Sequence, residues 1–169
     1  QRVAQSEHYG VLLGVSDFAP SEERRIIRHL IERRVDGLIL TGGGRDSSIY
    51  RLIDRHHIPY VVTWRLDAAA NCPCVSFDNY SAGRMAMSHL LELGHRRIGL
   101  ICGRSEVNDS ALERRKAYED SLSEHSIAVD PSLIFERDFE FIEGRTAMRR
   151  MLDGPDPPTA VFAANDIQA

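Results

Sequence analysis

The chain has 169 residues, of which 43% are hydrophobic and 27% are charged, and its formal net charge is −4. These values are typical of globular α/β proteins, and they exclude wholesale disorder. The acidic balance argues against a surface that itself binds nucleic acid, because such surfaces carry a basic face. No apolar run is long enough to span a membrane, and no hydrophobic signal-peptide core follows the N-terminus.

The first half of the chain alternates short apolar runs with helical patterns. Residues 9–15 predict a buried strand, and a helix is predicted to begin at Pro20 and to end at Asp36 and Gly37. The segments predicted after this helix are a strand at 38–40, a glycine loop at 42–44, a helix around 49–53, and strands at 58–63 and 74–77.

The second half repeats this rhythm. Asp78 or Asn79 is placed to cap a helix, and Gly94 suits the left-handed conformation that commonly follows a helix. The segments predicted after Gly94 are a strand at 97–102, a helix at 110–122, a strand at 133–135, a helix at 143–152 and a strand at 159–164.

Strands separated by helices predict βαβ units and parallel sheets flanked by helices, which is an α/β fold. The strands are apolar throughout, as expected of strands that are covered on both faces. The best internal seam lies near Gly94 and divides the chain into two predicted lobes, residues 1–94 and 95–169. The chain opens on the tail of a predicted helix and closes at the start of another, so we expect both lobes to be incomplete.

The sequence offers no cofactor or metal motif. The three cysteines, Cys72, Cys74 and Cys102, form no disulfide framework, which favours the reducing cytoplasm. One Cys-Pro-Cys pair without a second pair does not predict a zinc site. The glycine run at 42–44 matches neither a dinucleotide fingerprint nor a Walker loop. We therefore expect no cofactor, no metal and no catalytic constellation.

Several runs, in order along nearly the whole chain, resemble the LacI/GalR family of bacterial transcription regulators. The matching segments are 34–40, 58–62, 77–79 with Gly83, 90–98, Ser110 with Arg114 and Tyr118, and 158–166. The resemblance implies a type I periplasmic-binding-protein-like fold, in which two Rossmann-like lobes clamp a small molecule in the cleft between them.

The resemblance also implies a function. It predicts an effector-sensing domain that binds a sugar or sugar derivative, with a nucleoside or purine as the second choice. In the family, an N-terminal helix-turn-helix head that is absent from this chain binds operator DNA, and we expect a homodimer. Relative to the family pattern, the first strand of the first lobe and the last part of the second lobe are missing. The alternatives are a solute-binding protein of a sugar transporter and, less favoured, a nucleotide-using α/β enzyme.

Arg114 is the leading candidate for a ligand contact. The Ser110-x-x-x-Arg114 spacing resembles the helix start with which the family grips its ligand, although Ala117 stands where the family usually has glycine. A guanidinium suits this role because its planar fork donates two parallel hydrogen bonds. The alternative is a solvated helix arginine.

Three further candidates, Asn165, Asp166 and Phe139, come after predicted strands. Asn165 and Asp166 follow the last strand, and ligands of open α/β sheets bind beyond the carboxyl ends of strands. We expect Asn165 to contact the ligand and Asp166 mainly to cap the next helix. Phe139 lies five residues before Gly144, where the family often places an aromatic ring over the ligand, so the resemblance makes it the candidate to stack on the ligand. Phe141 is the competing candidate, and plain core packing is the alternative.

Trp64, Arg65 and Ser16 complete the predicted ligand site. Trp64 and Arg65 follow the strand that ends at Thr63, and Trp64 stands where the family commonly has Asp. This replacement predicts a stacking surface in place of a hydrogen-bond partner; the alternative is a Trp packed under a loop. Ser16 follows the strand predicted at 9–15 and is a weaker candidate of the same kind.

Overall fold

The computed structural model describes residues 2–17, 19–42, 47–64 and 73–169. The chain divides into two compact units: Gln1–Leu40 with Arg45–Val61, and Thr41–Gly44 with Val62–Ala169.

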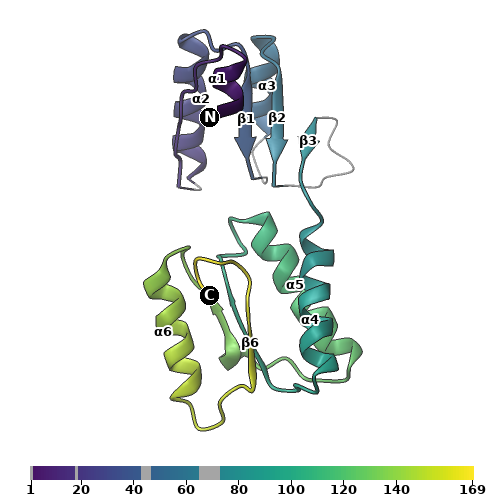
Figure 1. Ribbon diagram of the computed structural model, residues 1–169. Helices are drawn as coiled ribbons and strands as arrows, with labels where there is room; N and C mark the ends of the chain where they lie inside the picture. The colour runs from purple at the N-terminus through teal and green to yellow at the C-terminus, as the bar shows by residue number, and fades with distance from the viewer. Residues whose placement is uncertain (1, 18, 43–46, 65–72) are drawn as a thin grey trace. The chain divides into compact units, whose positions relative to one another are not determined.

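This division differs from the boundary predicted after Gly94. Helix α4 (Asn79–Glu92) packs along helix α5 (Asp109–Glu124), so that it belongs to the second unit. Figure 1 shows the two helices side by side. Asp78 is the N-cap of α4, since its Oδ1 accepts a hydrogen bond of 2.8 Å from the backbone N–H of Ser81. Gly94 follows the helix at φ +88°, as predicted.

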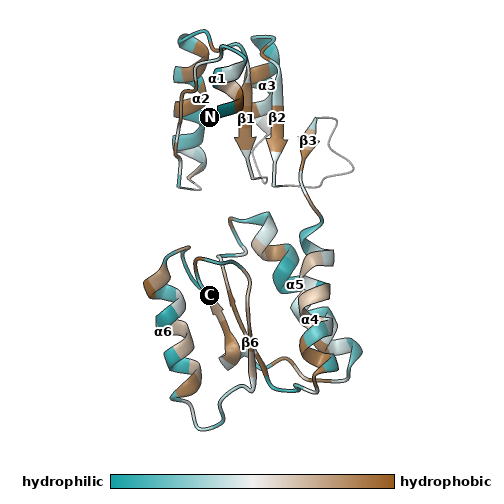
Figure 2. Ribbon diagram, viewed as in Figure 1, coloured by the Kyte–Doolittle hydropathy of each residue, from teal (hydrophilic) through white to brown (hydrophobic). Residues whose placement is uncertain are grey.

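The first part of the chain contains a sheet with the order β1-β2-β3. Strands β2 and β3 run parallel, with Val62 opposite Cys74, and the strands are among the most hydrophobic segments in Figure 2. The elements up to β3 are α1 (Arg2–Ser6), α2 (Pro20–Glu32), β1 (Leu38–Thr41), α3 (Ser47–Arg55), β2 (Tyr60–Thr63) and β3 (Cys74–Val75). The buried side chains of the first unit are Ile27, Leu38, Leu40, Ile49 and Ile53.

The strand predicted at 9–15 is wrong. Residues 9–15 form no regular secondary structure, and all of them are exposed; Leu13, for example, is 87% exposed. A strand needs a neighbouring strand to satisfy its backbone groups, and no described strand pairs with this segment. The apolar run is therefore extended chain without a ladder.

The second unit is built on a three-stranded parallel sheet with the order β5-β4-β6. Its remaining elements are β4 (Ile98–Cys102), the short 3-10 helix η1 (Pro131–Leu133), β5 (Ile134–Glu136), α6 (Phe141–Leu152) and β6 (Ala160–Ala163). These strands and helices match the predicted order, and the parallel sheet flanked by helices is confirmed.

Strand β4 lies at the centre of this unit, and all five of its residues are buried. Successive side chains point to opposite faces of a sheet. Ile98, Leu100 and Cys102 pack into one cluster with residues of α4 and α5, whereas Ile101 packs with Ala147 and Met151 of α6. Both faces of β4 are therefore covered, which explains its uninterrupted apolar sequence.

The carboxyl ends of all three strands meet at one edge of this sheet. The edge is where α/β sheets bind ligands, and here it carries the residues that follow β4, β5 and β6. No helix of the described residues is long and apolar enough to cross a membrane.

Candidate functional site

Arg114 joins three elements of the second unit. It lies on the second turn of α5 and is half-buried. Its Nε and Nη2 both donate to Oδ1 of Asn79, over 3.0 and 2.7 Å, and its Nη1 donates to the backbone oxygen of Ala164 after β6. A guanidinium has five N–H donors, so these bonds leave two for another partner.

The charge of Arg114 is held by neutral groups. Burial lowers the pKa of Arg114 from its ordinary value, and the nearby Glu113 carboxylate opposes this shift. An arginine remains a cation at neutral pH even so. A half-buried cation needs hydrogen bonds to offset its desolvation, and the amide of Asn79 and the carbonyl of Ala164 supply them.

Asn79 is a site residue that the sequence did not single out for this role. It is the first residue of α4, directly after the Asp78 cap, and its side chain is fully buried. The sequence offered it only as an alternative helix cap. The available signal was its place in the 77–79 run on which the resemblance to the LacI/GalR family depends.

Two aromatic rings lie near Arg114. The guanidinium carbon of Arg114 is 5.8 Å from the centroid of Phe77, within the range of a cation–π contact. Phe77 in turn meets Trp64 edge-to-face, with ring centroids 5.7 Å apart. Trp64 is 49% exposed and adopts φ +66°, and its backbone oxygen accepts a hydrogen bond of 3.0 Å from Oγ of Ser110. The structure thus brings Trp64 and Ser110 together.

Phe139 lies over the end of β4. It is half-buried, and a Cβ atom added at Gly103 would come within 2.3 Å of its ring. Only glycine leaves room for this ring at that position. Phe141, the competing aromatic, is 68% exposed at the start of α6. Phe139 therefore lies at the carboxyl edge of the sheet, and Phe141 lies on the outer surface of a helix.

Asn165 makes a local bond of the kind that was expected of Asp166. Oδ1 of Asn165 accepts a hydrogen bond of 3.0 Å from the backbone N–H of Gln168, and its Nδ2 donates to Oε1 of the same residue. Asn165 thus makes the cap-type bond expected of Asp166, which is exposed. Gln168 is buried and donates to the backbone oxygen of Asp138 over 3.0 Å, so it ties this turn to the end of β5.

The two remaining candidates, Ser16 and Arg65, stay predictions. Ser16 belongs to the first unit, and its backbone oxygen accepts a hydrogen bond of 2.8 Å from the N–H of Ala19. Arg65 lies outside the described residues, as do Gly43, Gly44 and Cys72.

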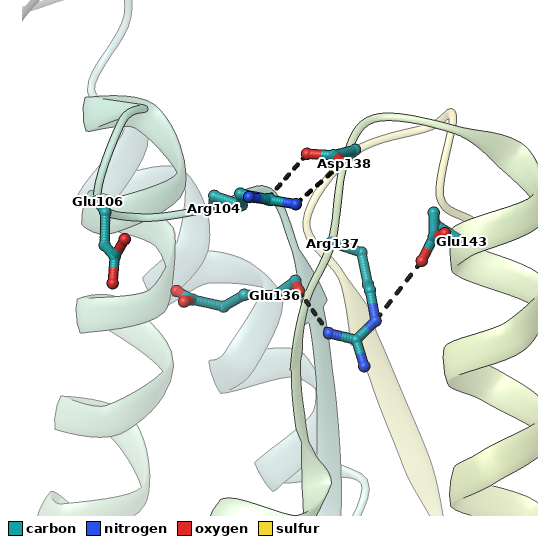
Figure 3. A pocket seen from close by; sticks show the side chains of 6 residues that line it. All are labelled: Arg104, Glu106, Glu136, Arg137, Asp138 and Glu143. Carbon is teal, nitrogen blue, oxygen red and sulfur yellow. Dashed lines mark hydrogen bonds and ion pairs between the residues drawn. The ribbon is translucent and has the colours of Figure 1, made fainter.

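A charged pocket, which the sequence did not predict, opens at the same edge of the sheet. It has a volume of about 320 Å³, and Figure 3 shows two ion pairs among the side chains that line it. Nε of Arg104 lies 2.9 Å from Oδ1 of Asp138, and Nε of Arg137 lies 3.6 Å from Oε2 of Glu143. The residues that line the pocket are Arg104, Glu106, Glu136, Arg137, Asp138 and Glu143.

Glu136 is the most constrained carboxylate of this pocket. It accepts hydrogen bonds from the N–H and the hydroxyl of Ser105 and, over 3.0 Å, from Nη1 of Arg115. Burial by itself would raise the pKa of Glu136, but the bonds from Ser105 and Arg115 outweigh it and hold the pKa below its ordinary value. Among the described residues, no group of three His, Cys, Asp or Glu side chains is arranged to hold a metal ion.

Comparisons with known proteins identify the family of this chain. The profile of a family described as periplasmic binding proteins and sugar binding domain of LacI family matches residues 4–169. The chain is 35% identical to the HTH-type transcriptional repressor CytR of Escherichia coli K12, over 98% of this chain and 48% of the relative. It is 32% identical to the repressor PurR of Haemophilus influenzae, over 95% of this chain and 48% of that protein.

The solved structures agree with the sequence comparison. The crystal structure of the transcription regulator GntR from Chromobacterium violaceum superposes with a TM-score of 0.86 at 26% identity, covering 99% of this chain and 61% of that one. The chain spans about half the length of the curated relatives it matches. It belongs to the family of periplasmic binding proteins and sugar-binding domains of LacI-type regulators.

Proposed function

We propose that this chain is the effector-sensing part of a LacI-type transcriptional regulator and that Arg114 contacts the effector. The observation that carries the proposal is a half-buried guanidinium at the carboxyl edge of a parallel sheet, with two donors left after its bonds to Asn79 and Ala164. A sugar or sugar derivative fits such donors through its hydroxyl oxygens, with a nucleoside or purine as the second choice. Phe139 and Trp64 supply aromatic surfaces that suit either class.

The regulatory part of the proposal rests on the relatives. The matched curated proteins are named as transcriptional repressors, and the chain spans about half of their length. We place a helix-turn-helix head in the remaining half of such a protein, and we place the regulator in the cytoplasm as a homodimer that reads paired operator half-sites. An effector changes operator affinity only if it binds two conformations unequally.

The chemistry at the site is that of binding. Among the described residues, the side chains that bond to or stack on Arg114 are the amide of Asn79 and the ring of Phe77, and neither is a nucleophile paired with a base. We therefore propose that the protein is not an enzyme, in keeping with relatives that are named as transcriptional regulators.

A solute-binding role in transport is the second candidate. It is favoured by the family description, which names periplasmic binding proteins beside the LacI domains. The matched curated relatives favour the regulator instead. Specific retention of the full-length protein on its own upstream DNA, released or strengthened by the effector, distinguishes the two functions.

A thermal-shift screen against sugars, sugar phosphates, nucleosides and purines tests the proposal. A compound that binds only the folded protein raises its melting temperature, and we expect a hit among the sugars or nucleosides. Arg114→Lys keeps the charge but loses the planar fork, so it should abolish the shift. The matched control is Arg84→Lys, because Arg84 joins the same two helices through Ser121 and Glu124. A shift that survives Arg114→Lys unchanged would overturn the proposed contact.

A further inference from the structure

We propose that Asn79 is a positioning residue for Arg114: its buried amide oxygen fixes the plane of the guanidinium and thereby aims the two remaining donors at the ligand. This inference rests on the proposed function, since it assigns a residue that acts on the ligand through Arg114.

The geometry of the contact fixes an orientation as well as a position. Nε and Nη2 lie on one edge of the guanidinium, and both donate to the same oxygen of Asn79, over 3.0 and 2.7 Å. Nη1 donates to the backbone oxygen of Ala164. A planar group that is held at two places cannot rotate about its long axis without breaking a bond. The direction of each of its two remaining N–H groups is therefore fixed.

A capping role does not account for Asn79. Asp78 already caps α4 through both of its carboxylate oxygens, which accept from the N–H and the hydroxyl of Ser81. Asparagine is a weak helix former, and a fully buried amide is costly without partners. Among the described residues, the side-chain hydrogen bonds of Asn79 are one of 3.5 Å from its Nδ2 to the backbone oxygen of Phe77 and the two that its Oδ1 accepts from Arg114.

The backbone on both sides is also held in place. A Cβ atom added at Gly83 of α4 would lie 3.3 Å from Cα of Arg114 and 2.8 Å from Cβ of Ala117. Glycine at this position therefore lets α5 approach α4 closely, and Ala117 keeps the facing side small. With its Cα held by this packing and its head held by Asn79, Arg114 has little freedom left.

The test reads the arginine side chain directly and needs no ligand. We would label the protein with 15N-arginine, assign the Nε–H signal of Arg114 by its loss in Arg114→Lys, and measure its exchange with water. In the unmodified protein the Nε–H of Arg114 should exchange at least about tenfold more slowly than exposed arginine Nε–H groups, because it is hydrogen-bonded and half-buried. Exchange as fast as that of exposed groups would overturn the proposal.

Three variants then assign the effect to Asn79. Asn79→Leu removes the acceptor and should abolish the protection, whereas Asn79→Asp keeps an acceptor oxygen at the same place and should retain it. Asp78→Ala removes the neighbouring helix cap but no contact of Arg114, so it should lower stability and leave the protection unchanged. Protection that persists in Asn79→Leu, or that is lost equally in Asp78→Ala, would contradict a positioning role.

The outcomes separate this inference from the proposed function. The exchange rates report on the Asn79–Arg114 contact whether or not any sugar binds. With a compound that shifts the melting temperature of the unmodified protein, Asn79→Asp should keep that shift and Asn79→Leu should lose most of it. A full shift in Asn79→Leu would contradict the inference while leaving Arg114 as the ligand contact.

Discussion

Two apolar runs of this chain have similar composition and opposite environments. Residues 9–15 are exposed and form no strand, whereas β4 is buried along its whole length. β4 has a parallel neighbour on each edge and helices on each face. The segment 9–15 has no strand partner among the described residues. The two runs therefore differ in what surrounds them and not in their apolar character: β4 is buried by strands and helices, and the segment 9–15 is not.

The largest expected contrast comes from one leucine in each run. Leu100 of β4 is 0% exposed and Leu13 is 87% exposed. Leu100→Ala should lower the free energy of unfolding by about 3 kcal/mol, because it removes buried methyl groups and leaves a cavity. Leu13→Ala should change it by less than about 0.5 kcal/mol. Denaturant unfolding measures both, and equal losses would contradict the contrast.

A glycine in each run gives the next contrast. A Cβ atom added at Gly99 of β4 would lie 2.6 Å from Sδ of Met151, whereas one added at Gly10 would meet no atom within 4 Å. Gly99→Ala should destabilise the protein by about 1–2 kcal/mol, since Met151 and α6 must shift. Gly10→Ala should be close to neutral. If the thermal midpoints of the two variants are the same, α6 does not pack on β4 as tightly as described.

The smallest expected effect is the pH dependence at the end of this sheet. The pKa of Glu136 is held below its ordinary value of 4.5, so the folded state binds its proton less tightly than the unfolded state. Glu136 therefore adds stability above pH 4.5, and this stability is lost as the pH falls through its lower, folded-state pKa. Glu136→Gln should flatten the stability profile in that acid range.

The matched control for this effect is Glu106→Gln. Glu106 lines the same pocket, and its carboxylate has no hydrogen bond or ion pair with any described residue. Denaturant unfolding at a series of pH values from 3 to 7 compares the two variants. An identical acid dependence in Glu136→Gln and the unmodified protein would show that the bonds from Ser105 and Arg115 do not hold the charge.

Much of the fold could be predicted because local patterns and their surroundings agree. The helices and β4, β5 and β6 are found where periodicity and apolar runs place them, since helices cover both faces of that sheet. The pattern at 9–15 failed because apolar character reports a preference for burial, not the presence of a strand partner. The predicted boundary at Gly94 separated α4 from α5, because sequence order carries no sign of their packing across Gly83 and Ala117.

The sequence led to the candidate site at one residue more readily than at its neighbours. Arg114 was singled out because the Ser110-x-x-x-Arg114 spacing resembles the helix start with which the family grips its ligand, whereas the role of Asn79 is hidden because an Asn beside Asp78 at a helix start also fits a cap. Asn165 makes a local bond to Gln168 that only the turn geometry reveals. The charged pocket depends on the spatial approach of Arg104 to Asp138, 34 residues apart in sequence, and no spacing motif predicts it.

The most direct test of the account is a crystal structure of the protein with the strongest sugar or nucleoside hit of the thermal-shift screen. The account predicts a ligand oxygen or nitrogen about 3 Å from Nη1 or Nη2 of Arg114, with the bonds from Arg114 to Asn79 intact. A ligand that occupies the charged pocket lined by Arg104 and Glu136 and makes no contact with Arg114 would contradict it.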